Sequence, residues 1–168
     1  EDKSCKVYLA PFDVRLPKDN EADEEIDTVV QPDLSIICNI EKIDEKGCKG
    51  APDLVAEILS PGSAIRDLKI KRELYEHYRI KEYWIILPLD RIVEVYIMDE
   101  NNRYGQPQVY GNEDTITSTI FPDLEIATNK TFPSEYTLSG KNNNSDEGKA
   151  PAGTPVIDWN IEAADKER

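Results

Sequence analysis

The chain has 168 residues, of which 39% are hydrophobic, and its net charge at pH 7 is −14. This length suits one domain with its own core, and no apolar run approaches the roughly 18 residues that cross a bilayer. The negative charge disfavours tight, sequence-independent binding to nucleic acid, because phosphates would be repelled. We therefore expect a soluble domain.

The cysteines point to a reducing compartment. Cys5, Cys38 and Cys48 are odd in number and have no metal-like spacing, and the lone histidine, His77, cannot complete a zinc site with them. We expect free thiols and a cytoplasmic protein.

The first half of the chain predicts short strands separated by polar segments. Residues 5–16 alternate enough for one or two strands around Pro11, and residues 29–38 form another strand. The acidic segment 19–27 reads as a solvated hairpin loop, and the polar segment 39–50 as a connection.

The middle of the chain predicts a strand, a helix and a hairpin. Residues 52–60 form a short apolar strand, and the helix begins after Ser63, a plausible N-cap, and runs to about Tyr78. Residues 82–88 and 91–98 are rich in β-branched and aromatic side chains, so we expect two strands paired as a hairpin.

The C-terminal part is less regular. A short strand is expected near Gln108 and a final strand or turn near Ile126. Residues 139–155 have the composition of a flexible linker. We therefore divide the chain into a folded domain at 1–136 and a polar flexible tail at 137–168.

The predicted helix carries charges on its apolar face. At about 100° per residue, Asp67 and Lys71 lie on the side that also holds large side chains. Those side chains are Ile70, Leu74, Tyr75 and Tyr78. Two charges therefore point toward the core.

Two strands add inward carboxylates. The period of two places Glu57 on one face with Val55 and Leu59, and Asp33 sits just inside the start of its own strand. Buried carboxylates are costly unless they are paired or bind a cation. Asp33 and Glu57 would suit a hard divalent ion such as Mg²⁺, with Mn²⁺ as a substitute, and Lys71 could stabilise charge on a phosphate.

A purely structural interpretation of the same residues is open at this point. Asp67 and Lys71 could form an i, i+4 ion pair, while Glu57 pairs with some other basic residue. Asp53 could bond a turn at the strand entrance, and Tyr75 could simply belong to the core.

Three segments together carry a family resemblance. They are QPDLSIIC at 31–38, GAPDLVAEILSPGS at 50–63 and RDLKIKRELYEHYRIKEYWIILP at 66–88. In this order they resemble the Uma2 (Uma-two) putative restriction endonuclease family, a bacterial branch of the PD-(D/E)XK nuclease superfamily. The likeness extends over about 10–132 and is specific over 51–84, where EILSP, D-x-x-x-K-x-x-x-Y and EYW occur in sequence.

The resemblance implies an α/β fold with a restriction-endonuclease-like core, in which helices flank a mixed β-sheet. It implies that Asp33 and Glu57 hold magnesium, and that Lys71 and Asp67 complete the catalytic set. The expected activity is metal-dependent endonuclease cleavage of DNA by a metal-activated water. RNA cleavage is a weaker option.

Three features favour a different reading. Leu59 stands where the superfamily motif has lysine, the family's N-terminal segment is absent, and the net charge is −14. Leu87 also precedes Pro88 where the family commonly has aspartate. The alternative is a catalytically inactive nuclease-like module for interaction or oligomerisation. DNA binding is expected to be weak and salt-dependent through residues 66–81, and a homodimer is left open.

Overall fold

The computed structural model describes residues 5–59 and 65–132, without the side chains of residues 65–67. Its described residues form a six-stranded sheet in the order β1-β4-β7-β8-β9-β10. The strands are β1 (Lys6–Leu9), β4 (Leu34–Ile37), β7 (Leu54–Ile58), β8 (Glu82–Leu87), β9 (Ile92–Ile97) and β10 (Gln108–Tyr110). Within the described part of this sheet, only β7 and β8 pair in parallel. The sheet is therefore mixed, as expected.

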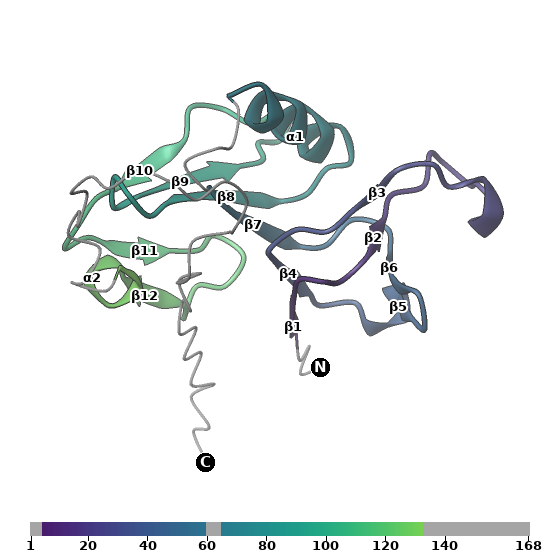
Figure 1. Cartoon of the computed structure of the whole chain (residues 1–168), viewed down its shortest axis with the longest axis horizontal. Coiled ribbons are helices and arrows are strands. Elements are labelled where there is room, and N and C mark those ends of the chain that lie inside the picture. Colours follow the sequence, from purple (N-terminus) through teal and green to yellow (C-terminus); the bar gives the residue numbers. More distant parts are fainter. Residues whose placement is uncertain (1–4, 60–64, 133–168) are drawn as a thin grey trace, which may run out of the picture.

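Helix α1 (Ile65–His77) links β7 to β8 and covers one face of the sheet (Figure 1). Parallel neighbours need such a crossover, because a tight turn cannot join them. From the helix, Tyr75 packs with Leu68 and Leu74 against Val55 and Tyr83 of the strands. Ile70, expected on this face, is 50% exposed, so the prediction for that residue is wrong.

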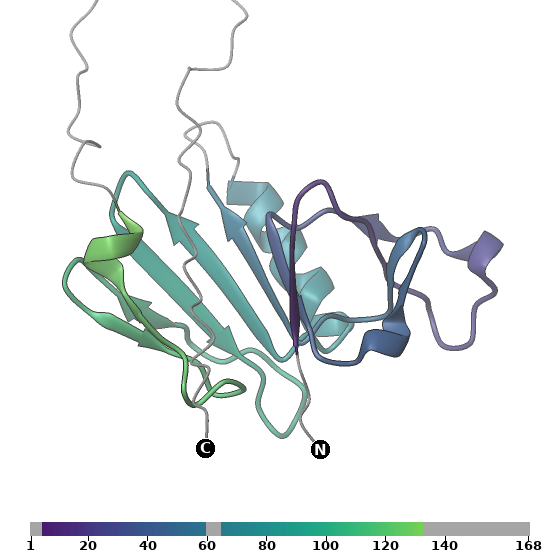
Figure 2. The same cartoon turned by 90° about the horizontal axis from the view of Figure 1, so that it is seen from below.

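The opposite face carries the second part of the core. There Trp84 and Ile86 of β8 pack with Ile116 and Phe132. The covering elements are β11 (Thr115–Thr117), β12 (Glu125–Ala127) and α2 (Thr128–Thr131). Figures 1 and 2 show them across the sheet from α1.

A buried carboxylate fastens this covering layer to the sheet. Glu82, at 0% exposure, accepts hydrogen bonds from Trp84 Nε1 at 3.0 Å and Ser118 Oγ at 3.0 Å. The backbone N–H groups of Thr119 and Ile120 donate to the same carboxylate at 2.6 and 3.2 Å. Such a set of donors offsets the cost of burying Glu82.

A second, four-stranded sheet lies beside the β1 and β4 end of the main sheet (Figure 2). Its order is β3-β2-β6-β5, with β2 (Val14–Arg15), β3 (Val29–Val30), β5 (Ile43–Asp44) and β6 (Gly47–Lys49). Two short 3-10 helices, η1 (Asp23–Glu25) and η2 (Ile40–Lys42), join its parts.

This sheet corrects two expectations. Segment 39–50 is not merely a connection, because Ile43 and Cys48 pack with Val14, Leu16 and other apolar side chains. The strand expected over 29–38 is broken before Leu34, and its halves join different sheets. Proline lacks the N–H needed for pairing, and Pro32 lies at the break.

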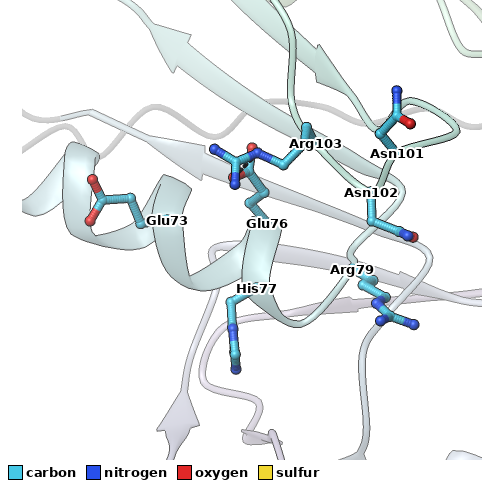
Figure 3. A pocket seen from close by; sticks show the side chains of 7 residues that line it. All are labelled: Glu73, Glu76, His77, Arg79, Asn101, Asn102 and Arg103. Atoms are coloured by element: carbon cyan, nitrogen blue, oxygen red, sulfur yellow. Dashed lines mark ion pairs between the residues drawn. The ribbon is translucent and has the colours of Figure 1, made fainter.

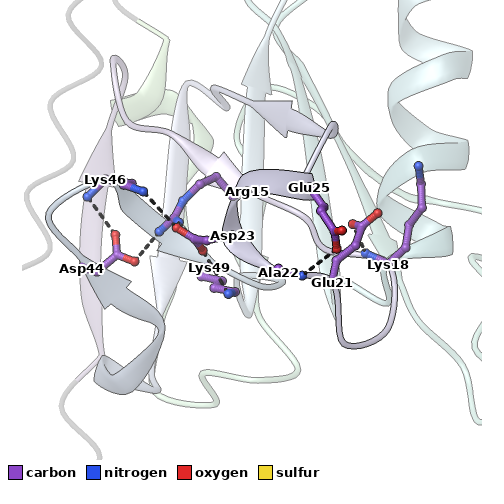
Figure 4. A network of polar contacts seen from close by, with 9 residues as sticks. All are labelled: Arg15, Lys18, Glu21, Ala22, Asp23, Glu25, Asp44, Lys46 and Lys49. Carbon is purple, nitrogen blue, oxygen red and sulfur yellow. Dashed lines mark hydrogen bonds and ion pairs between the residues drawn. The ribbon is translucent and has the colours of Figure 1, made fainter.

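The acidic segment 19–27 is not a freely solvated loop, because ion pairs connect it to the second sheet (Figure 4). Arg15, only 6% exposed, places one guanidinium nitrogen 2.8 Å from Asp23 and bonds Asp44 with another. Lys49 and Lys46 lie 2.9 and 3.1 Å from the same Asp23 carboxylate. Hydrogen bonds from Lys49 and Lys46, with the charge of Arg15, lower the pKa of Asp23 to about 2.

The cysteines differ from expectation. Cys5 and Cys38 form a disulfide, so the prediction of three free thiols is wrong for these two. The register of β1 and β4 pairs Lys6 with Ile37, which places the cysteines opposite each other one residue further on. Cys48 is free and buried, and burial raises the pKa of its thiol to about 11.

Among the described residues, no helix is long and apolar enough to span a bilayer.

Candidate active site

Asp33 and Glu57 meet across two neighbouring strands. The register that pairs Leu34 with Ala56 puts Asp33, the residue before β4, opposite Glu57 in β7. The Asp33 carboxylate accepts a hydrogen bond of 2.7 Å from the backbone N–H of Ile58. Because residues opposite each other in an antiparallel pair share a face, both carboxylates belong to the α1 side of the sheet.

Two residues of α1 contact the Glu57 carboxylate. Lys71 Nζ lies 2.8 Å from Oε2, and the Tyr75 hydroxyl donates a hydrogen bond of 2.6 Å to Oε1. The side chain of Glu57 is only 5% exposed, whereas that of Lys71 is 40% exposed. Lys71 and Tyr75 are one helical turn apart, which places them on one side of α1.

The electrostatics of Glu57 reflect this setting. Burial raises the pKa of the Glu57 carboxyl, the hydrogen bonds from Lys71 and Tyr75 oppose that rise, and the charge of Asp33 adds to it. Burial, followed by the charge of Glu57, raises the pKa of the Tyr75 hydroxyl, which therefore acts as a donor. A cation beside the two carboxylates would relieve the cost of charging Glu57.

The residues present offer two carboxylate ligands to a hard divalent ion. Asp33 and Glu57 offer carboxylate oxygens, the ligands that Mg²⁺ prefers, and Mg²⁺ keeps several waters when only one or two carboxylates bind it. No group of three or more Asp, Glu, His or Cys side chains within the described ranges is arranged to hold a metal. The side chain of Asp67, the fourth predicted site residue, lies outside the described residues.

Asp53 and His77 lie outside this cluster. Asp53 accepts hydrogen bonds from the Cys38 N–H at 2.9 Å and from Lys81 at 2.7 Å, which matches a role at the strand entrance. His77 is exposed near the end of α1. There it lines a polar pocket of about 420 Å³ in which Arg103 lies 3.1 Å from Glu76 (Figure 3).

The sequence patterns predict no role at this site for Tyr75 or Glu94. Glu94 pairs with Ile85, which pairs with Glu57, so it occupies the same row of the sheet two strands away. Its carboxylate accepts a hydrogen bond from Tyr96 at 3.1 Å. The spacing of Tyr75 four residues after Lys71 was the available signal, since it implies a shared helix face.

A mixed sheet with a helix over the strand that bears a buried glutamate defines an α/β protein with a restriction-endonuclease-like core. The chain belongs to the Uma2 family, described as putative restriction endonuclease, whose model matches residues 1–129. Membership in this family supports a nuclease function.

One of the solved structures that match gives the same fold. It is the crystal structure of a putative nuclease belonging to DUF820 from Anabaena variabilis ATCC 29413, with 18% sequence identity and a TM-score of 0.57. The alignment covers 76% of this chain and 67% of that chain. No curated protein matches the chain.

Proposed function

We propose that the protein is a metal-dependent endonuclease that cleaves DNA phosphodiester bonds with a metal-activated water. The observation that carries this proposal is that Glu57 lies opposite Asp33 in the sheet and 2.8 Å from Lys71 of α1. Family membership supports the same class of reaction.

The site residues have distinct roles in this proposal. Asp33 and Glu57 would hold Mg²⁺ or Mn²⁺, which supplies an activated water and polarises a phosphate oxygen when bound. Lys71 would offset the negative charge that grows on the phosphate during attack. Its half-exposed side chain can reach toward a substrate, whereas Glu57 is fixed in the core.

The absence of a lysine at Leu59 does not remove a cation from the site. Leu59 packs against the apolar cluster under α1. The ammonium group comes instead from Lys71, one helix later in the chain, and it reaches Glu57 directly. The geometry thus supports Lys71 in the position of the motif lysine.

The test uses purified protein and supercoiled plasmid with Mg²⁺ or Mn²⁺. We expect nicking and divalent-ion binding by calorimetry, and the substitution Glu57→Gln should abolish both. Asp53→Asn is the matched control, because Asp53 immediately precedes β7, the strand of Glu57, but bonds Cys38 and Lys81 instead. Neither nicking nor ion binding in the unsubstituted protein would contradict the proposal.

One observation favours a second candidate, a catalytically inactive nuclease-like module for interaction or oligomerisation. Both oxygens of Glu57 already have a partner in the chain, Lys71 on one and Tyr75 on the other. A ligand that binds the native state raises the melting temperature, so magnesium should stabilise a nuclease and leave such a module unchanged.

A further inference from the structure

Tyr75 occupies an unusual position between the core and the candidate site. Its side chain is at 0% exposure, and its hydroxyl donates the 2.6 Å hydrogen bond to Glu57 Oε1. Lys71 contacts the other oxygen, Oε2, at 2.8 Å. The carboxylate is therefore held at both ends by one face of α1.

The ring of Tyr75 is itself fixed by packing. It makes an edge-to-face contact with Tyr83, with ring centroids 4.9 Å apart. Val55, Ile80 and Ile85 belong to the same buried cluster. A tyrosine ring confined in this way has little rotational freedom, so its hydroxyl presents one direction to Glu57.

Tyr83 shows that burial alone does not produce such a contact. It is also at 0% exposure, on the strand next to Glu57, and its hydroxyl has no hydrogen-bond partner among the described residues. The two tyrosines share a cluster, but only Tyr75 bonds the carboxylate. They form a matched pair for substitution.

We infer that Tyr75 is a positioning residue, whose hydroxyl holds the Glu57 carboxylate beside Asp33 in the orientation that a divalent cation requires. This inference rests on the proposed function. Without the hydroxyl, Glu57 keeps only the contact with Lys71, whose side chain is 40% exposed, and its carboxylate can rotate away from Asp33. Groups that orient a metal ligand commonly change metal affinity by about 10- to 100-fold when removed.

The experiment compares Tyr75→Phe with Tyr83→Phe in the full chain. Mg²⁺ and Mn²⁺ binding is measured by calorimetry without DNA, and plasmid nicking is measured over a series of Mg²⁺ concentrations. For Tyr75→Phe we expect cation binding weaker by about 10- to 100-fold. The Mg²⁺ concentration for half-maximal nicking should rise by the same factor, with the KM for plasmid unchanged.

The control separates positioning from packing. Tyr83→Phe should bind cations and nick plasmid like the unsubstituted protein, and thermal unfolding in EDTA reports any general loosening. Equal loss of cation affinity in both variants, or unchanged affinity in Tyr75→Phe, overturns the inference while the proposed function stands. If the unsubstituted protein neither binds cations nor nicks plasmid, the proposed function is overturned and the inference with it.

Discussion

Lys71 Nζ lies 2.8 Å from Glu57 Oε2 and joins the second turn of α1 to the buried part of β7. The two ends of this ion pair differ in exposure, 40% for the Lys71 side chain and 5% for that of Glu57. The pair therefore balances a carboxylate that is largely shielded from water. Removing the lysine leaves a buried charge without its nearest cation.

We predict that Lys71→Met lowers the free energy of unfolding in EDTA by about 1–3 kcal/mol. This is less than the roughly 3–5 kcal/mol for breaking a fully buried pair, because Lys71 is partly solvated. If Asp33 and Glu57 bind Mg²⁺, saturating magnesium should reduce the loss, since the ion stabilises the folded state. Urea unfolding with and without magnesium measures both effects.

The control is Lys69→Met on the exposed side of α1. Lys69 lies 3.9 Å from Glu73, and both side chains are well exposed. A surface substitution of this kind should stay within about 0.5 kcal/mol. A Lys71→Met protein as stable as the control would show that Glu57 does not depend on the pair.

The sequence was sufficient for the elements around the site. The helical period predicts α1, and the apolar, β-branched and aromatic side chains predict β7 and the β8–β9 hairpin. β5 and β6 were missed, because these short strands depend on pairing with one another and with β2, which is distant in the sequence. The disulfide was missed for the same reason.

The candidate site was partly predictable. The period of two predicts that Glu57 faces the core, and the helical period predicts the same for Lys71. In the structure the two side chains are in contact. The helical period, with the apolar face centred on Asp67, predicts that Ile70 is buried. In the structure Ile70 is exposed, and the helix packs against the sheet through Leu68 and Tyr75 instead. The bond from Tyr75 to Glu57 depends on the separation of helix and sheet, which no periodicity gives.

Asp23 leads to a prediction for acid stability. Its folded pKa of about 2 lies below the ordinary value of 3.8, so the protonated form is disfavoured in the folded state. This contribution to stability is fully present above pH 3.8 and is lost as the pH falls toward 2. The urea concentration at the unfolding midpoint should fall as the pH is lowered from 3.8 toward 2. In Asp23→Asn the midpoint should depend less on pH over this range.

Asp90→Asn serves as the comparison for Asp23, since Asp90 is exposed and lies outside the contacts of Arg15. The fall in the urea midpoint that the Asp23 contacts produce should remain in Asp90→Asn. An unchanged pH dependence of the midpoint in Asp23→Asn would show that the Lys49 and Lys46 contacts do not persist in solution.

Glu82 should matter for stability and not for chemistry. Glu82→Ala leaves the indole of Trp84 and the hydroxyl of Ser118 without an acceptor in the core, so we expect a loss of about 3–5 kcal/mol. Ser118→Ala removes one donor to Glu82 and the acceptor for the N–H groups of Ile120 and Phe121, and it should cost about 1–3 kcal/mol. Denaturant unfolding measures both, and nicking per folded molecule should be unchanged in each.

The Cys5–Cys38 disulfide gives the last prediction. It closes a loop between residues 33 apart, and a cross-link of this kind stabilises a fold by about 2–4 kcal/mol, mainly by restricting the unfolded chain. Cys5→Ser with Cys38→Ser should lower the unfolding midpoint accordingly.

Thiol titration of the denatured, non-reduced protein should find one thiol, that of Cys48, and three after reduction. In the folded protein Cys48 should react slowly, because burial raises its pKa to about 11 and leaves little thiolate at neutral pH. Three thiols without reduction would show that the protein is purified with Cys5 and Cys38 unlinked, and dithiothreitol would then leave the midpoint unchanged.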